Sequence, residues 1–301
     1  MRLIYPRDNL LKSIPLMALM AAINIIVSEF AALSLIVSVF LILCLPLTSA
    51  IVELCCKDRY FPIYALATFG LSVALTFWNL QTVFFYVLPS IITGYIFGAM
   101  IKNKIPAIWS IFAATLAQVA LTYSMIPLVN LIYQIDIIST FKTTFNVTHV
   151  NGIDIIVPTF IFLISLLQVS LSHLIVSQEL PKFKITYEKN ALLDYIASVV
   201  GVVFGLIIWL LYFFNLEFAY LCLCVSLFFA AYSALLLIKK TLAFSLISIG
   251  IVLFINIFVF ASLQGIMISH SQLLLLSFSS VCICVISSLF SLLHKKKEKI
   301  Q

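Results

Sequence analysis

The stretch FFYVLPSIITGYIFGAMIKNK, residues 84–104, carries one proline and two glycines inside a largely apolar run and ends on two lysines. In water, an interior glycine costs a helix about 1 kcal/mol and a proline about 3 kcal/mol. In a membrane the penalty is softened, because neighbouring helices satisfy the freed backbone groups. Gly94 and Gly98 share one helix face and let a second helix approach closely. The stretch therefore indicates a transmembrane helix that leaves the lipid at Lys102 and Lys104.

The composition extends this interpretation to the whole chain. Of its 301 residues, 64% are hydrophobic and 9% are charged, whereas a soluble domain is roughly 25% charged. A water-soluble fold of this length cannot bury so much apolar surface. We therefore expect an all-α, polytopic transmembrane protein, in which each span needs about 20 apolar residues. Ten apolar runs can be separated: 13–29, 33–54, 60–78, 81–101, 106–134, 152–178, 192–214, 217–238, 241–263 and 270–293.

The charged residues give an orientation. The 17 lysines and arginines outnumber the 11 acidic residues, and they lie in the short segments between apolar runs, which favours a topological role over a nucleic-acid partner. With the N-terminus inside and ten crossings, every basic residue except Lys142 falls on the inner side. The pattern predicts a multi-pass protein of the cell membrane with both termini in the cytoplasm.

The prolines divide the chain. All nine lie at or before Pro181, and each of the first six apolar runs carries at least one. Kinked helices can enclose a cavity, whereas straight helices more often form a supporting bundle. We expect a six-helix membrane domain over 1–180 and a four-helix extension over 190–301.

Several function classes lack their motifs. The chain has no G-x-x-x-x-G-K-[ST], no H-E-x-x-H and no G-x-S-x-G, so we expect no enzyme, no metal and no cofactor. Glu29 and Glu53 fall close to the ends of their runs rather than deep in the membrane. Active transport would therefore need energy from a partner.

Polar and aromatic side chains gather toward the outer ends of the first six runs. The candidate ligand-binding residues are Trp78, Asn79, Gln81, Tyr86, Gln118, Asn130 and Asp154. Trp78 and Tyr86 would offer stacking surfaces, and Asp154 could pair with a ligand cation. An aromatic belt at the membrane interface also explains Trp78, and a buried Gln118 could equally tie two helices together.

Three pairs of small residues are spaced four apart. They are Ala18 with Ala22, Gly94 with Gly98, and Gly201 with Gly205. This spacing permits close helix approach, either within the chain or to a docking partner.

Two stretches carry a resemblance, CLPLTSAIVELCCKDRYFPIYALATF at 44–69 and FYVLPSIITGYIFGAMIKNKIPA at 85–107. Together they resemble the YybS-like family of predicted bacterial membrane proteins, which looks related to the S-components of energy-coupling-factor (ECF) transporters. The resemblance covers about residues 10–180. It implies a six-helix unit that binds a small nutrient from outside and docks on a transmembrane coupling subunit driven by two ATPases. Ala18 and Ala22 occupy the place of the family's docking A-x-x-x-A.

The leading expectation is therefore a substrate-capture subunit for uptake of a small nutrient, with energy supplied by a partner. An alternative is a membrane scaffold that holds other proteins and transports nothing. A self-sufficient carrier built from two inverted five-helix repeats fits the length, but the prolines concentrate in the first half and the halves show no internal similarity.

Overall fold

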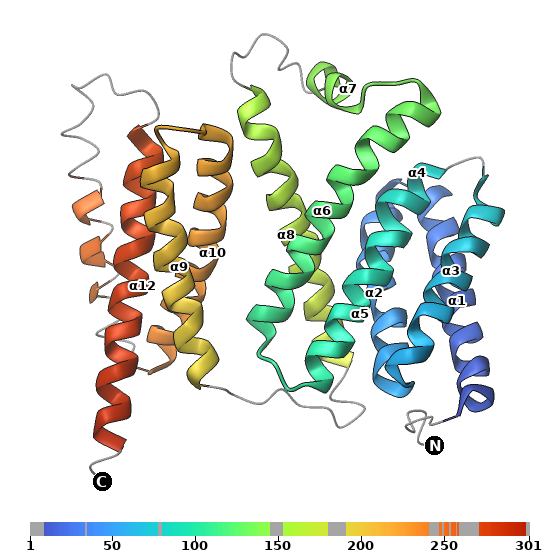
Figure 1. Ribbon diagram of the computed structural model, residues 1–301, viewed down its shortest axis with the longest axis horizontal. Coiled ribbons are helices and arrows are strands. Elements are labelled where there is room, and N and C mark those ends of the chain that lie inside the picture. The colour runs from blue at the N-terminus through green and yellow to red at the C-terminus, as the bar shows by residue number, and fades with distance from the viewer. Residues whose placement is uncertain are drawn as a thin grey trace. The chain divides into compact units, whose positions relative to one another are not determined.

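The computed structural model describes residues 9–33, 35–77, 80–144, 153–179, 191–240 and 271–298, with a few more between 247 and 258. These residues form helices and turns and contain no β-strand (Figure 1). The first helices are α1 (Leu10–Leu33), α2 (Leu35–Cys55), η1 (Asp58–Tyr60), α3 (Phe61–Leu75), α4 (Leu80–Thr82), η3 (Val83–Val87) and α5 (Leu88–Lys102). The later helices are α6 (Ala107–Tyr133), α7 (Ile137–Thr144), α8 (Ile153–Glu179), α9 (Ala191–Leu211), α10 (Leu216–Lys240) and α12 (Ser271–Glu298).

Seven helices within the described residues are long and apolar enough to cross a membrane. The spans are Leu10–Phe30, Leu80–Lys102, Ala107–Tyr133, Val157–Glu179, Leu192–Leu211, Leu216–Ile238 and Leu273–Phe290. The chain is therefore a polytopic, all-helical membrane protein, as its composition predicts. Helix α3 has 15 residues and is about 22 Å long, short of the roughly 30 Å hydrocarbon layer. The run 241–263 lies largely outside the described residues, so the count of ten spans stays a prediction.

The opening stretch changes its helix type at the proline. Val83–Val87 forms a π-helix, and α5 begins only at Leu88, with Pro89 in its first turn. The helix is nevertheless continuous, since Leu80–Lys102 is one apolar span and the Leu88 N–H donates to the Val83 carbonyl. The wider π-helical turn directly before Pro89 is how this helix accommodates a proline in its interior.

Residue contacts divide the chain into two compact units. Unit 1 comprises residues 1–150 and 161–189, and unit 2 comprises residues 151–160 and 190–301. The predicted domain boundaries, 1–180 and 190–301, stay a prediction.

In unit 1, α2 is packed between α1 and α5. A Cβ built on Gly98 would lie 2.6 Å from the Cβ of Glu53, and one built on Gly94 would lie 2.5 Å from the Cβ of Ser49. Both glycines therefore allow α5 to approach α2 more closely than any larger residue would. In unit 2, Gly201 on α9 faces Cys284 of α12 in the same way, and α9, α10 and α12 pack against one another.

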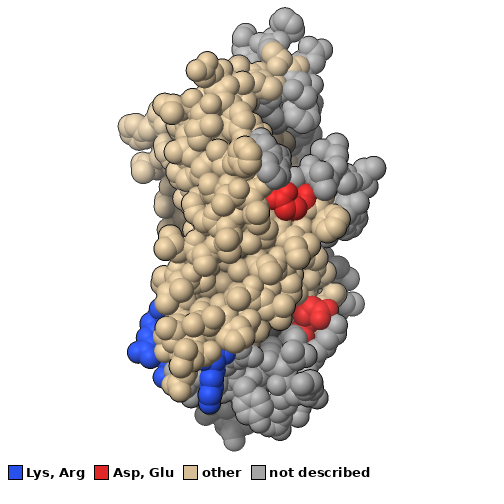
Figure 2. Space-filling model, turned by 90° about the vertical axis from the view of Figure 1, so that its right-hand side faces the viewer, with Lys and Arg blue, Asp and Glu red and all other residues tan. Residues whose placement is uncertain are grey.

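Apart from Lys142 on α7, the described basic residues of unit 1 lie at one end, which we call the basic end. Lys12 lies at the start of α1, Lys57 and Arg59 follow α2, and Lys102 and Lys104 lie at the end of α5. Figure 2 shows the blue side chains of this face gathered at its lower end. Successive helices of unit 1 thus return the chain to the same end, as the charge pattern predicts for alternating crossings.

Candidate functional site

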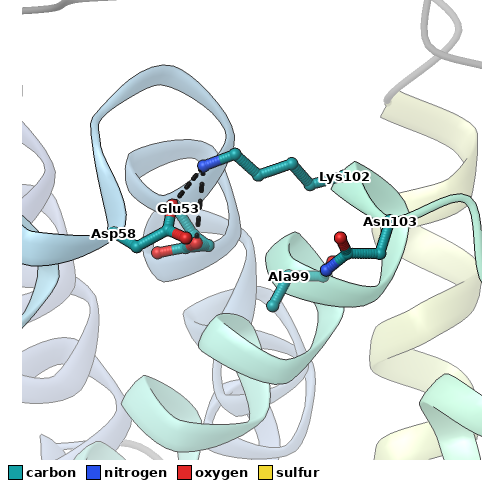
Figure 3. Close-up of polar contacts among 5 residues, drawn as sticks. All are labelled: Glu53, Asp58, Ala99, Lys102 and Asn103. Atoms are coloured by element: carbon teal, nitrogen blue, oxygen red, sulfur yellow. Dashed lines mark hydrogen bonds and ion pairs between the residues drawn. The ribbon is translucent and has the colours of Figure 1, made fainter.

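A buried acid lies at the basic end, where α2 meets α5 (Figure 3). Glu53 is 1% exposed, because its side chain packs over Gly98. The Lys102 Nζ lies 3.8 Å from the Glu53 Oε1, and it also donates a hydrogen bond to Asp58. The second Glu53 oxygen, Oε2, has no hydrogen-bond partner among the described residues. One lysine is thus shared between a buried carboxylate and an exposed one.

Asp58 lies outside the spans, in η1, and its electrostatics follow from this contact. The hydrogen bond from Lys102 holds the pKa of Asp58 below its ordinary value, because it stabilises the charged carboxylate. Asp58 is 67% exposed at its side chain, so the effect on stability is small. The hydrogen bond to Asp58 therefore holds Lys102 at the exposed end of the α2–α5 contact.

Deeper in unit 1, a hydrogen-bonded network joins α1, α2 and α3. The Asn24 Nδ2 donates to the Thr48 Oγ1 at 3.0 Å. The Tyr64 hydroxyl donates to the same Thr48 oxygen at 3.3 Å and lies 3.2 Å from the Ser49 Oγ. All four side chains are buried. The Asn24 Oδ1 has no partner among the described residues.

Helix α3 extends this network along its length. Tyr64, Thr68, Ser72 and Thr76 recur every four residues, and each is at most 1% exposed. Residues four apart share one helix face, so the buried side of α3 is a row of hydroxyls. The Thr68 and Ser72 hydroxyls have no partner among the described residues. We call this set the polar seam: Asn24, Ser28, Thr48, Ser49, Tyr64, Thr68 and Ser72.

An open groove of about 420 Å³ lies between α1 and α3. Its α1 wall includes Ala18, Ala21 and Ala22, and its α3 wall includes Ala67 and Leu71. Tyr64 also lines the groove, while its hydroxyl belongs to the polar seam. Small residues on the α1 wall leave room for a large apolar partner.

The predicted ligand-binding residues do not line this groove. Gln118 on α6 is buried, and its Nε2 donates to the Gln168 Oε1 of α8 at 2.7 Å. The Asn130 Oδ1 accepts a hydrogen bond from the Ile137 backbone N–H, at the start of α7. Both amides thus make bonds within the chain, which is the alternative that the sequence leaves open for Gln118.

The remaining predicted ligand residues are not brought together by a described contact. Gln81 on α4 is half-buried and Tyr86 in η3 is 38% exposed. Trp78 and Asn79 lie outside the described residues, as does the side chain of Asp154 on α8. The ligand site at these positions stays a prediction.

The small-residue pairs have different surroundings. Gly94 and Gly98 contact α2, and a Cβ on Gly205 would meet Val281 of α12 and Ser226 of α10. Ala18 and Ala22 instead are exposed along the groove. Among these positions, the alanine pair is the one that the described residues leave accessible.

Sequence reasoning missed the polar seam and the burial of Glu53. The seam had a local signal, because Tyr64, Thr68, Ser72 and Thr76 keep a strict spacing of four residues. Glu53 had none, because its burial depends on Gly98, which lies on another helix. A carboxylate near the end of an apolar run can therefore be buried by a neighbouring helix.

Comparison with known proteins adds no relative. No family model, no curated protein and no solved structure matches the chain. The resemblance to the YybS-like family and to S-components therefore depends on the two quoted stretches, and everything it implies stays a prediction. The fold class, an all-helical membrane protein with several spans, is established by the helices themselves.

Proposed function

We propose that the chain is a substrate-capture subunit of the cell membrane, with an S-component-like unit in its first six helices. It crosses the membrane ten times with both termini in the cytoplasm, and a partner supplies the energy for uptake of a small nutrient. The gathering of Lys12, Arg59 and Lys102 at one end of unit 1 supports the orientation, because basic residues favour the cytoplasmic side.

The observation that carries the proposal is the groove between α1 and α3. Helices associate in lipid through van der Waals packing, and small residues permit the closest approach. Ala18 and Ala22 are exposed along the groove, where a helix of a coupling subunit could pack against them. For the small nutrient, the sequence predicts a site toward the outer ends of the first six apolar runs, at Asn79, Gln81 and Asp154. This function involves binding and movement and no catalytic step.

The test is co-purification of the chain in mild detergent, with the groove open or filled. Ala18→Leu fills the groove, and Ala74→Leu is the matched control, since Ala74 is an exposed alanine of α3 that does not line it. We expect a membrane coupling subunit and ATPases to accompany the wild type and Ala74→Leu, and to be lost with Ala18→Leu. Recovery of the chain without ATPases in all three preparations would contradict the proposal.

A scaffold without transport is the second candidate. The bonds of Gln118 to Gln168 and of Asn130 to the α7 backbone favour it, because these amides already serve the fold. The two functions differ at Asn79, Gln81 and Asp154. Their substitution by alanine abolishes binding of a co-purified small molecule if the chain captures a substrate, and it changes nothing if the chain is a scaffold.

A further inference from the structure

Two carboxylates bracket the polar seam in unit 1. Asn24 of α1 bonds to Thr48 of α2. Glu29 follows Asn24 by five residues, and Glu53 follows Thr48 by five residues. Because the two helices run in opposite directions, the two acids lie on opposite sides of this bond. At 1.5 Å per residue, they are separated by about 15 Å along the helix axes.

The polar atoms along this distance are incompletely bonded. Five buried atoms have no hydrogen-bond partner among the described residues: the Glu29 Oε1, the Asn24 Oδ1, the Thr68 Oγ1, the Ser72 Oγ and the Glu53 Oε2. Native proteins leave few buried polar atoms without a hydrogen bond, and ordered water often supplies the missing partner. The Asn24 amide already bonds to the Thr48 hydroxyl, and Thr68 and Ser72 follow Tyr64 on the buried face of α3, so the seam supplies polar groups of the kind that bind a buried water.

We infer that the polar seam holds a file of water molecules and conducts protons between Glu29 and Glu53. Hydroxyl groups suit this role because each can donate one hydrogen bond and accept others. Ser49, Tyr64 and Thr48 already form a continuous contact across α2 and α3. A proton bound by one carboxylate is matched by a proton released from the other, so the transfer consumes no reactant.

The charged groups at the two ends define the entry and the exit. Around Glu53, α5 contributes Lys102 and η1 contributes Asp58. One turn earlier on α2, Ser49 lies 3.2 Å from the Tyr64 hydroxyl of α3. The charged residue of α1 on that side is Lys12, at the basic end. Glu29 forms no ion pair within the described part of the chain. Lys102 can break its ion pair with Glu53 while its hydrogen bond to Asp58 persists. The Glu53 carboxylate can then exchange a proton with the basic end.

Ionisable residues inside a membrane protein are costly and usually functional. The sequence places Glu53 near the end of an apolar run, where a charged side chain is common. The structure instead buries it under Gly98, with one oxygen unbonded. Proton conduction goes beyond the proposed function, because it requires neither a captured nutrient nor a partner subunit.

The experiment measures proton flux through the full chain alone. The purified protein is reconstituted into vesicles that contain a pH-sensitive dye, and a potassium gradient with valinomycin drives protons inward. We expect acidification faster than in protein-free vesicles for the wild type. Glu53→Gln keeps the side-chain shape and removes the titrating group, so its flux falls to the protein-free level.

Two further variants keep the result interpretable if Glu53→Gln folds poorly. Thr68→Val removes one seam hydroxyl at nearly constant size and slows the flux. Ser226→Ala removes a buried hydroxyl of unit 2, whose partners are Ser280 and the Gly201 carbonyl, and leaves the flux unchanged. Wild-type flux equal to that of empty vesicles would overturn the inference, as would undiminished flux in a folded Glu53→Gln protein.

Discussion

Buried serines of unit 2 bond to one another across helices, whereas several buried polar atoms of unit 1 have no partner among the described residues. In unit 2, Ser198 on α9 lies 2.8 Å from Ser233 on α10, and Ser226 on α10 bonds to Ser280 on α12. In unit 1, Thr68 and Ser72 share one face of α3 without such bonds. Buried hydroxyls thus bond across helices in one bundle, whereas those of Thr68 and Ser72 have no protein partner among the described residues of the other.

Proline and glycine follow the same division. Helices α9, α10 and α12 contain no proline, and Gly201 and Gly205 bring them into close contact. Helices α1 and α2 each contain a proline, Pro15 and Pro46. The two bundles therefore differ both in where their helices carry proline and in how their buried hydroxyls are bonded.

The largest expected effect comes from filling the close helix contacts. Gly98→Leu places a branched side chain where Glu53 and the Ala50 carbonyl lie within 3.1 Å of a built Cβ. We expect a loss of about 3 kcal/mol in the free energy of unfolding, because the helices must separate. The measurement is a denaturant titration in detergent micelles.

The control for this substitution is Gly70→Leu on α3, where a built Cβ would meet nothing within 4 Å. It should leave the unfolding free energy close to that of the wild type. Gly205→Leu in unit 2 should destabilise as Gly98→Leu does, since it faces Val281. Equal stability of Gly98→Leu and Gly70→Leu would show that α2 and α5 do not meet at this face.

The sequence could predict these contacts because their signals are local. Four-residue spacing of Gly94 and Gly98 indicates a packing face, and the structure has α2 on that face. The apolar composition likewise suffices for the all-helical membrane class. The π-helix before Pro89 could not be foreseen, because it depends on how neighbouring helices accommodate the proline. The burial of Glu53 could not be foreseen either, since it requires the partner helix.

The second prediction compares two hydroxyls directly. Ser226→Ala removes bonds to Ser280 and to the Gly201 carbonyl, and we expect a loss of about 1 kcal/mol in unfolding free energy. Thr68→Val removes a hydroxyl that has no protein partner, so the change should stay within about 0.5 kcal/mol. Thermal or denaturant unfolding of both variants measures the difference. A Thr68→Val protein as unstable as Ser226→Ala would mean that Thr68 is bonded like the serines of unit 2.

The smallest expected effect concerns pH at the basic end of unit 1. The hydrogen bond from Lys102 holds the pKa of Asp58 below the ordinary value of 3.8. A lowered pKa in the folded state stabilises the protein above that value, and the stabilisation is lost as the pH falls below it. Because Asp58 is exposed, the contribution is about 0.5 kcal/mol.

Asp58→Asn removes this contribution. The variant should be slightly less stable than the wild type at neutral pH, and the two should converge as the pH falls through the lowered pKa of Asp58. Unfolding titrations at a series of pH values test this. A wild-type minus variant difference that grows as the pH falls would contradict the assigned pair.

The most direct test of the contrast between the units is labelling by hydroxyl radicals generated from water in the intact, lipid-embedded protein. Tyr64 in the polar seam and Phe229 in unit 2 are 1% and 0% exposed, so bulk solvent reaches neither ring. Water inside the seam predicts oxidation of Tyr64, read by mass spectrometry, while Phe229 stays unmodified. Equal protection of both rings would show that the interior of unit 1 is as dry as that of unit 2.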